Sequence, residues 1–263
     1  MFTKKQVLLC AGILVLSTLS FRSVGQLYVG LEAGGNQNYL ITNVSNLVST
    51  EYSPKSGFCF AIPIQYKIND WFAIEAAPGF TDKNYQMKRT GFYEGVYQDT
   101  KSHYLQLPIG AKFSFGGKKL KGFVDAGGFV AHWSSCHIKG AMPNPLDDKP
   151  YGSTLPFASL TIFDYVTPYN YDEKYQFNTT KDNRFEGGVY AGVGLSYEPQ
   201  KNWSFFTAFK YYDGLTDLQK NYELGGVPRY NETASFTVGF LYKPSFCCLK
   251  MKHCHKTTSS TTK

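Results

Sequence analysis

The sequence predicts an all-β fold, an eight-stranded antiparallel up-and-down β-barrel that spans a membrane. Of the 263 residues, 17% are aromatic and 18% are charged, whereas soluble domains carry roughly 25% charged residues. Eight alternating, aromatic-rich segments recur, and the loops between them alternate between short and long. The aromatic content excludes a disordered chain. A mean hydropathy of −0.29 excludes a bundle of membrane-spanning helices.

The positive net charge lies at the two ends of the chain. Residues 1–25 and 243–263 contain basic residues and no acid. The intervening 26–242 carries 19 basic and 20 acidic residues out of the totals of 27 and 20. A nearly neutral body offers no basic face, so nucleic acid is not an expected partner.

Residues 1–25 are predicted to be a secretory signal peptide. Lys4 and Lys5 precede the apolar stretch 7–19, and the small residues of Ser23-Val24-Gly25 provide a cleavage site. The alternative is an uncleaved membrane anchor, for which the apolar run is short. Domain boundaries follow: a signal peptide over 1–25, the barrel over 26–242 and a basic tail rich in Cys, Lys and Thr over 243–263.

The predicted strands alternate apolar and polar side chains between Gly, Asn, Asp and Pro. They cover residues 27–37, 56–67, 70–82, 102–115, 119–133, 184–198, 201–213 and 231–242. A tilted strand that crosses a bilayer needs roughly 9–11 residues, and strands of soluble proteins have about five or six. The predicted strands are therefore long enough to span.

The connections between the strands fall into two alternating groups. The short ones cover 67–70, 116–118 and 198–201, and the long ones cover 38–55, 83–101, 134–183 and 214–230. Outer-membrane barrels have short periplasmic turns and long external loops. We therefore expect an outer-membrane location with both termini in the periplasm. Lipid, lipopolysaccharide and the barrel-assembly machinery are the partners that this location implies.

The alternation predicts an apolar face toward the lipid and a polar interior, whereas a soluble lipocalin-like carrier would have an apolar interior. Charges inside so small a barrel must pair. The predicted internal ion-pair network consists of Glu32, Glu75, Lys112, Glu186 and Lys210. Alternatively, some of these residues lie near strand ends and are hydrated. Aromatic residues at strand ends predict interfacial girdles; these are Trp71, Trp133, Trp203, Tyr211 and Tyr242.

The long connection 134–183 predicts structure of its own, because unstructured loops of this length are uncommon. Its segment 157–166 has strand character. We expect the flanking strands to extend beyond the membrane, or a small cap to form. Its aromatic residues are candidates for contact with an extracellular protein or glycan: Phe157, Phe163, Tyr165, Tyr169 and Tyr171. Alternatively, the aromatic residues of this loop pack on one another and close the barrel mouth.

Two further features bear on chemistry. His132 precedes Ser134 and Ser135 at the outer end of a predicted strand, the one local arrangement that suggests a lipid-modifying enzyme. A rim histidine is more often an interface residue, and no catalytic motif accompanies it. The tail holds Cys247, Cys248 and Cys254. Their spacing matches no defined zinc site, so no metal or other cofactor is expected.

Residues 104–115 read Tyr-Leu-Gln-Leu-Pro-Ile-Gly-Ala-Lys-Phe-Ser-Phe. This segment resembles the central strand of the PorT-like outer-membrane β-barrel family, and residues 123–133, 187–197 and 235–242 resemble other strands of that family. The resemblance implies a Gram-negative outer-membrane barrel, and some relatives take part in type IX secretion. Such barrels usually end on the last aromatic residue, whereas 21 residues follow Tyr242 here.

We therefore expect a non-enzymatic outer-membrane barrel with a structural or surface-binding role through its external loops, such as adhesion. The alternative is an accessory component of a PorT-like, type IX secretion system. A lipid-modifying outer-membrane enzyme is the third hypothesis.

Overall fold

The computed structural model describes residues 26–42, 49–144, 146–147, 160–200, 202–220 and 227–244. The predicted signal peptide, Phe157 and the tail from residue 245 onward lie outside the described residues. Within these ranges, no helix is long and apolar enough to cross a membrane.

All paired strands of the described chain are antiparallel. They are β1 (Gln26–Thr42), β2 (Thr50–Ala61), β3 (Ile64–Lys67), β4 (Phe72–Ala76), β5 (Gly79–Asp82), β6 (Tyr85–Arg89), β7 (Tyr97–Gly116), β8 (Leu120–Pro143), β9 (Pro168–Lys174), β10 (Phe185–Gln200), β11 (Trp203–Gly214) and β12 (Arg229–Tyr242). Within the described residues of the long connections, the chain forms two 3-10 turns, η2 (Gly91–Tyr93) and η4 (Ile162–Asp164).

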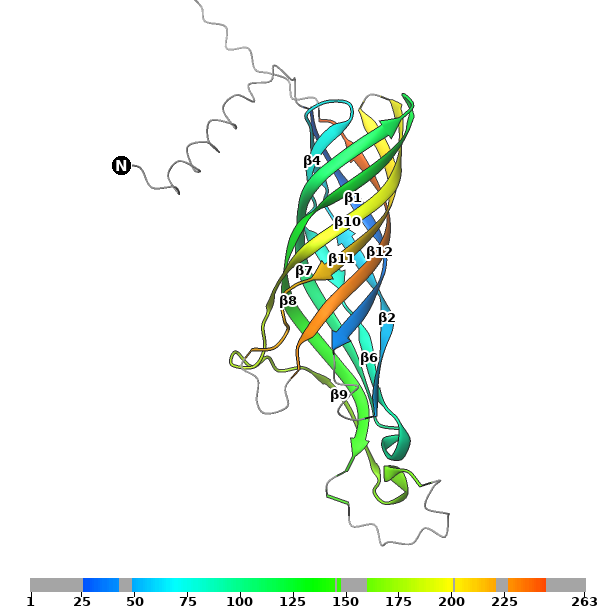
Figure 1. Cartoon of the computed structure of the whole chain (residues 1–263), viewed down its shortest axis with the longest axis vertical. Coiled ribbons are helices and arrows are strands. Elements are labelled where there is room, and N and C mark those ends of the chain that lie inside the picture. Colours follow the sequence, from blue (N-terminus) through cyan, green and yellow to red (C-terminus); the bar gives the residue numbers. More distant parts are fainter. Residues whose placement is uncertain are drawn as a thin grey trace, which may run out of the picture.

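The pairings close the sheet into a ring of eight strand positions, which confirms the predicted fold (Figure 1). β2 and β3 share one position, and β4, β5 and β6 share the next. β7 pairs with β8, and β8, β10, β11 and β12 then follow in order until β12 pairs with β1. Closure leaves no free sheet edge in the lipid.

Several strands are longer than predicted at the end with the long connections. β1 continues to Thr42, β7 begins at Tyr97 and β8 reaches Pro143. Outside the lipid the exposed face need not be apolar, so the alternation that marks the predicted strands fades while the backbone ladder continues. The predicted strand character of 157–166 is wrong where it is described. Thr161 and Asp164 form a capping box there and start the 3-10 turn η4.

The side chains of the wall alternate as predicted. Ile109, Val193 and Phe236 are each about half exposed on the outside, at 51%, 54% and 59%. Neighbouring residues on the same strands point into the barrel. Phe205 and Phe206 illustrate the alternation, because Phe205 is 50% exposed and Phe206 is 6% exposed. The apolar outer face meets lipid, and the interior is mainly polar.

The tight turn between β7 and β8 depends on a glycine. Gly116 has φ of 119°, a conformation that side chains with a Cβ rarely adopt. The Gly117 N–H donates to the Leu120 carbonyl over 3.0 Å and closes the turn. Gln26 pairs with Lys67 and Tyr242 pairs with Trp203, so both lie beside the other two short turns. Phe72 pairs with Phe113 and Leu120 pairs with Tyr197, which places the β7–β8 turn at the same end of the barrel.

We predict that an arginine on the outer face destabilises the barrel in a depth-dependent way. Val193→Arg places a charge in the middle of the lipid-facing belt and is expected to cost about 2–4 kcal/mol of unfolding free energy, whereas Tyr197→Arg near the strand end costs about 0–1 kcal/mol. Urea unfolding in lipid vesicles measures both. Equal losses for the two variants would contradict the placement of Val193 deeper in the lipid than Tyr197.

Candidate functional site

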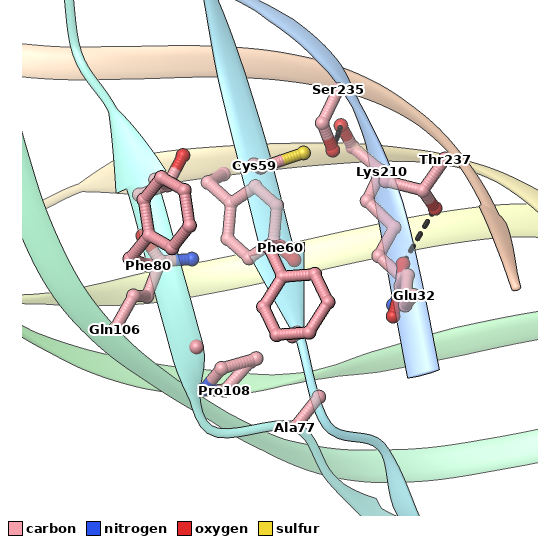
Figure 2. A pocket seen from close by; sticks show the side chains of 14 residues that line it. Glu32, Cys59, Phe60, Ala77, Phe80, Gln106, Pro108, Lys210, Ser235 and Thr237 are labelled. Carbon is pink, nitrogen blue, oxygen red and sulfur yellow. Dashed lines mark hydrogen bonds and ion pairs between the residues drawn. The ribbon is translucent and has the colours of Figure 1, made fainter. Parts of the chain in front are cut away.

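Four of the predicted interior charges lie together inside the barrel. The Lys210 Nζ contacts Glu32 Oε1 at 3.1 Å and Glu75 Oε1 at 3.8 Å. The Lys112 Nζ contacts Glu75 Oε2 at 3.2 Å. All four side chains are at most 5% exposed. Thr237 donates its hydroxyl to Glu32 Oε1 over 2.5 Å (Figure 2). The four charges form one network, which we call the central ion cluster.

The fifth predicted residue, Glu186, lies in a separate ion pair. Its Oε1 is 2.5 Å from the Lys83 Nζ, and its Oε2 accepts from Asn231 Nδ2 over 3.0 Å. The sequence analysis missed Lys83 by assigning it to a long loop. Lys83 lies two residues after Thr81, whose side chain points into the barrel, and side chains two residues apart on a strand point to the same face. This alternation is the sequence signal that identifies Lys83 as an interior residue.

Asp125 is a second interior charge that the sequence analysis missed. It is 2% exposed, and neither carboxylate oxygen has a hydrogen-bond partner in the described part of the chain. Asp125 lies two residues after Phe123 on β8, so both side chains point into the barrel, and Phe123 is also 2% exposed. The alternation of side chains along β8 is therefore the sequence signal that places Asp125 inside the barrel.

Trp133 is wrongly predicted as a girdle residue. It points into the barrel at 8% exposure and stacks on Tyr104, with centroids 5.9 Å apart and an interplanar angle of 2°. The loop residue Tyr175 stacks on Trp133 at 6.0 Å and 10°, and Phe177 meets its ring edge-on at 4.9 Å. β8 continues beyond the belt, so Trp133 is not at a strand end and keeps the inward parity of Ala131.

These aromatic rings close the external mouth of the barrel. Tyr175 donates its hydroxyl to Asp182 Oδ1 over 3.0 Å, and burial, followed by the charge of Asp182, raises the pKa of Tyr175 to about 12. Of the two arrangements expected for the aromatic residues of the long loop, closure of the mouth therefore applies to Tyr175 and Phe177.

The other predicted girdle residues lie on the outside of the wall. Trp71 is 58% exposed and stacks on Phe113 with centroids 6.0 Å apart. Trp203 contacts Tyr242 at 4.8 Å near the short turns. Tyr211 is 40% exposed toward the opposite end of its strand, where its hydroxyl donates to Glu232.

The long connection between β8 and β10 builds a hairpin outside the barrel. β9 pairs with the last part of β8, from His137↔Lys174 to Pro143↔Pro168. β7 flanks β8 on the other side through Tyr97↔Ala141. Figure 1 shows β8 and β9 projecting beyond the rest of the barrel. We call β9 and residues 137–143 of β8 the external hairpin.

The candidate contact residues take different positions around the external hairpin. Tyr169 is 53% exposed. Tyr171 is half-buried and donates its hydroxyl to Gln98 Oε1 over 3.1 Å. Tyr165, next to η4, contacts Phe92 of η2 with centroids 5.9 Å apart. Phe163 is half-buried in η4. Tyr169 is thus the most available of the described candidates.

His132 and Ser134 do not form a catalytic pair. The His132 ring contacts Phe185 on the outer face with centroids 5.0 Å apart. The Ser134 hydroxyl donates to the His103 carbonyl over 2.8 Å. This geometry does not activate a nucleophile, because the base does not accept the hydroxyl proton.

Removing Lys210, one of the two lysines of the central ion cluster, should be strongly destabilising. Lys210→Met leaves Glu32 without its basic partner in the interior, and we expect a loss of about 3–5 kcal/mol in unfolding free energy. Lys210→Met combined with Glu32→Gln should recover part of it, and Lys118→Met in an exposed turn is the control. Equal stability of Lys210→Met and Lys118→Met would show that the cluster is hydrated and weak.

The external hairpin should loosen at low pH. Hydrogen bonds from His137 and Lys139 hold the pKa of the Asp172 carboxyl below its ordinary value of 3.8. A carboxyl whose pKa is lower in the folded state than in the unfolded state stabilises the fold at pH values above its unfolded-state pKa. This stabilisation is lost as the pH falls through the folded-state pKa. Amide exchange of residues 169–173, corrected for intrinsic rates, should therefore accelerate below about pH 4. Asp172→Asn should remove this pH dependence, and its retention in that variant would refute the assignment.

Comparisons with known proteins found a family and solved structures to which the chain is similar. Residues 20–135 match the family described as outer membrane protein beta-barrel domain. Neisserial surface protein A is 15% identical with a TM-score of 0.41, covering 83% of this chain and 97% of its own. Ail, the attachment invasion locus protein of Yersinia pestis, is 12% identical with a TM-score of 0.40, and the match covers 83% of this chain and 99% of Ail. The outer membrane protein OprG of Pseudomonas aeruginosa is 11% identical with a TM-score of 0.43, and the match covers 83% of this chain and 96% of OprG.

No curated protein sequence matches the chain. The family match covers β1 to β7 and most of the membrane-crossing part of β8. The structure of the described chain is a closed antiparallel sheet with an apolar outer face and a polar interior. The chain therefore has the fold of an outer-membrane β-barrel.

Proposed function

We propose that the protein is a non-enzymatic surface-binding barrel that uses its external hairpin to contact an extracellular protein or glycan. The observation that carries the proposal is that this hairpin continues the barrel wall beyond the membrane and exposes apolar side chains. Lipopolysaccharide around the belt and the barrel-assembly machinery are the partners that accompany the location.

The exposed residues suit a protein or glycan contact. Met142 and Tyr169 pair across the external hairpin and are 41% and 53% exposed. Phe92 and Tyr93 of η2 are 41% and 40% exposed. Tyr, Phe and Met are enriched in interfaces. Because β7 and β8 hold the hairpin in the sheet, binding requires little ordering of the backbone.

The closed interior favours binding over transport. The Lys83–Glu186 pair and the stacked rings of Tyr104, Trp133 and Tyr175 fill the barrel near its mouth. Small barrels of this kind have an interior filled by side chains. The exposed chemistry is therefore concentrated on the external hairpin and the turns beside it.

The test is binding of the barrel in nanodiscs to immobilised extracellular matrix proteins and glycosaminoglycans. We expect saturable binding to one of them, and Met142→Ser combined with Tyr169→Ser should weaken it at least about tenfold, as for interface anchors worth 1–2 kcal/mol. Tyr39→Ser, an exposed aromatic residue of β1, is the matched control. Binding to none of the probes, or equal affinity of the double variant and the control, would refute the proposal.

The alternative, an accessory role in a PorT-like secretion system, rests on the resemblance of residues 104–115. It predicts that crosslinking from the external hairpin or the tail in cells captures a membrane or periplasmic partner. Copurification of such a partner with tagged protein would favour this role over surface binding.

A further inference from the structure

β9 forms an open edge of the sheet outside the membrane. It is the last strand in the order of the described sheet and pairs with β8 alone. Every residue of β9 except Tyr171 is exposed. The backbone N–H and C=O groups along such an edge are a template on which another strand can pair. The edge is therefore a candidate interaction surface that uses the backbone of the external hairpin.

Two hydrogen bonds show which backbone groups of β9 face away from β8. The Tyr175 N–H donates to the Cys136 carbonyl over 3.0 Å. The Asn144 N–H donates to the Thr167 carbonyl over 3.0 Å. In an antiparallel pair every second residue exchanges bonds with the partner strand, so residues 167, 169, 171, 173 and 175 face β8. The backbone groups of the alternate residues point to the open edge; these residues are Pro168, Asn170, Asp172 and Lys174. Three of them have an N–H to donate, because proline has none.

Side-chain contacts hold β9 against the two strands behind it. Tyr171 lies over Gly140 of β8, where a Cβ would come within 2.5 Å of the tyrosine hydroxyl, and it donates to Gln98 of β7. Asp172 turns back toward β8 and accepts from the Lys139 Nζ over 3.0 Å. Both contacts reach away from the open edge. β9 is thus held extended before a partner arrives, which lowers the entropy cost of adding one.

We propose that β9 binds an extended segment of an extracellular protein, which adds to the sheet as a further antiparallel strand. This inference deepens the proposed surface-binding function and rests on it. A row of N–H and C=O groups at the strand repeat matches another peptide backbone, whereas a glycan has no such repeat. The partner that fits the edge is therefore a protein segment whose main chain supplies most of the contact.

A second copy of the chain in the same membrane does not fit this edge. β8 and β9 project beyond the rest of the barrel along its long axis (Figure 1). A two-fold symmetric contact between two β9 edges runs the strands antiparallel, because the two-fold axis is perpendicular to the strands. The second barrel then points the opposite way and cannot lie in the same bilayer.

The side chains of β9 add a preference to this backbone contact. Tyr169, Tyr171 and Glu173 alternate with the edge residues and share one face of the strand. A β-branched residue opposite Tyr169 and a basic residue opposite Glu173 would form favourable cross-strand pairs. The expected segment therefore alternates β-branched residues and carries a lysine or arginine at one end.

The first test uses a fluorescent peptide, Thr-Lys-Thr-Val-Thr-Val-Thr, as the probe. Paired antiparallel, it places its lysine opposite Glu173 and its second valine opposite Tyr169. Fluorescence anisotropy measures its binding to the full chain in nanodiscs, where we expect saturable binding. N-methylation of the third and fifth threonines removes two edge donors, keeps every side chain and should weaken binding at least about fivefold.

A matched pair of variants tests the edge from the side of the barrel. Asn170→Pro removes an N–H that makes no bond to β8 and should weaken the peptide about two- to tenfold, as for one neutral hydrogen bond. Asn170→Ala keeps the N–H and should bind like the wild type. Amide exchange at Tyr171 and Glu173 checks that β9 stays paired with β8 in both variants.

The second test compares Asn170→Pro with the wild type on the matrix protein or glycosaminoglycan that the barrel binds. We expect a bound protein and a weaker affinity of Asn170→Pro. Unchanged affinity of Asn170→Pro, combined with loss of binding in the Met142→Ser and Tyr169→Ser double variant, would overturn the edge and leave the proposed surface-binding function standing.

Three further outcomes would overturn the proposal. The first is no saturable binding of the peptide, and the second is equal binding of its N-methylated form. The third is clustering of lipid vesicles that carry only this barrel, if Asn170→Pro abolishes the clustering, because the occupant is then a second copy in an opposing membrane.

Discussion

The need to pair every backbone N–H and C=O group in hydrocarbon governs this structure. Closure of β1 against β12 satisfies the last edge of the sheet, so only the side chains need to match the surroundings. The apolar face then turns outward and the polar face turns inward. This inversion places Glu32 and Lys210 where a soluble domain of similar size has its apolar core.

The polar interior carries a cost that pairing offsets. Each lysine of the central ion cluster lies within reach of a carboxylate, and Lys112 also lies 3.9 Å from the centroid of the Phe123 ring. Toward the external side, the Lys83–Glu186 pair gives way to the stacked rings around Trp133. The interior therefore serves as a rigid core that supports the loops.

The proposed binding surface lies where the regular wall leaves the lipid. The external hairpin is the part of the sheet that leaves the lipid and is free to expose Met142 and Tyr169 to a partner. Elsewhere in the wall, the carbonyls of Pro63, Pro78 and Pro108 accept ladder bonds whose reciprocal bonds cannot form, because proline has no N–H. A barrel built by uniform pairing offers chemistry mainly at such exceptions.

The sequence by itself determined the strand number, the inward and outward faces and the ends with short and long loops, because period-two alternation and turn residues are local signals. It also placed Glu32 and Lys112 inside. Only the tertiary structure decided that Trp133 points inward, that Lys83 joins Glu186 and that β9 extends the wall. These features depend on how far each strand continues and which distant strand lies beside it. That register is set by long-range pairing around the closed ring, for which no short stretch of sequence carries a signal.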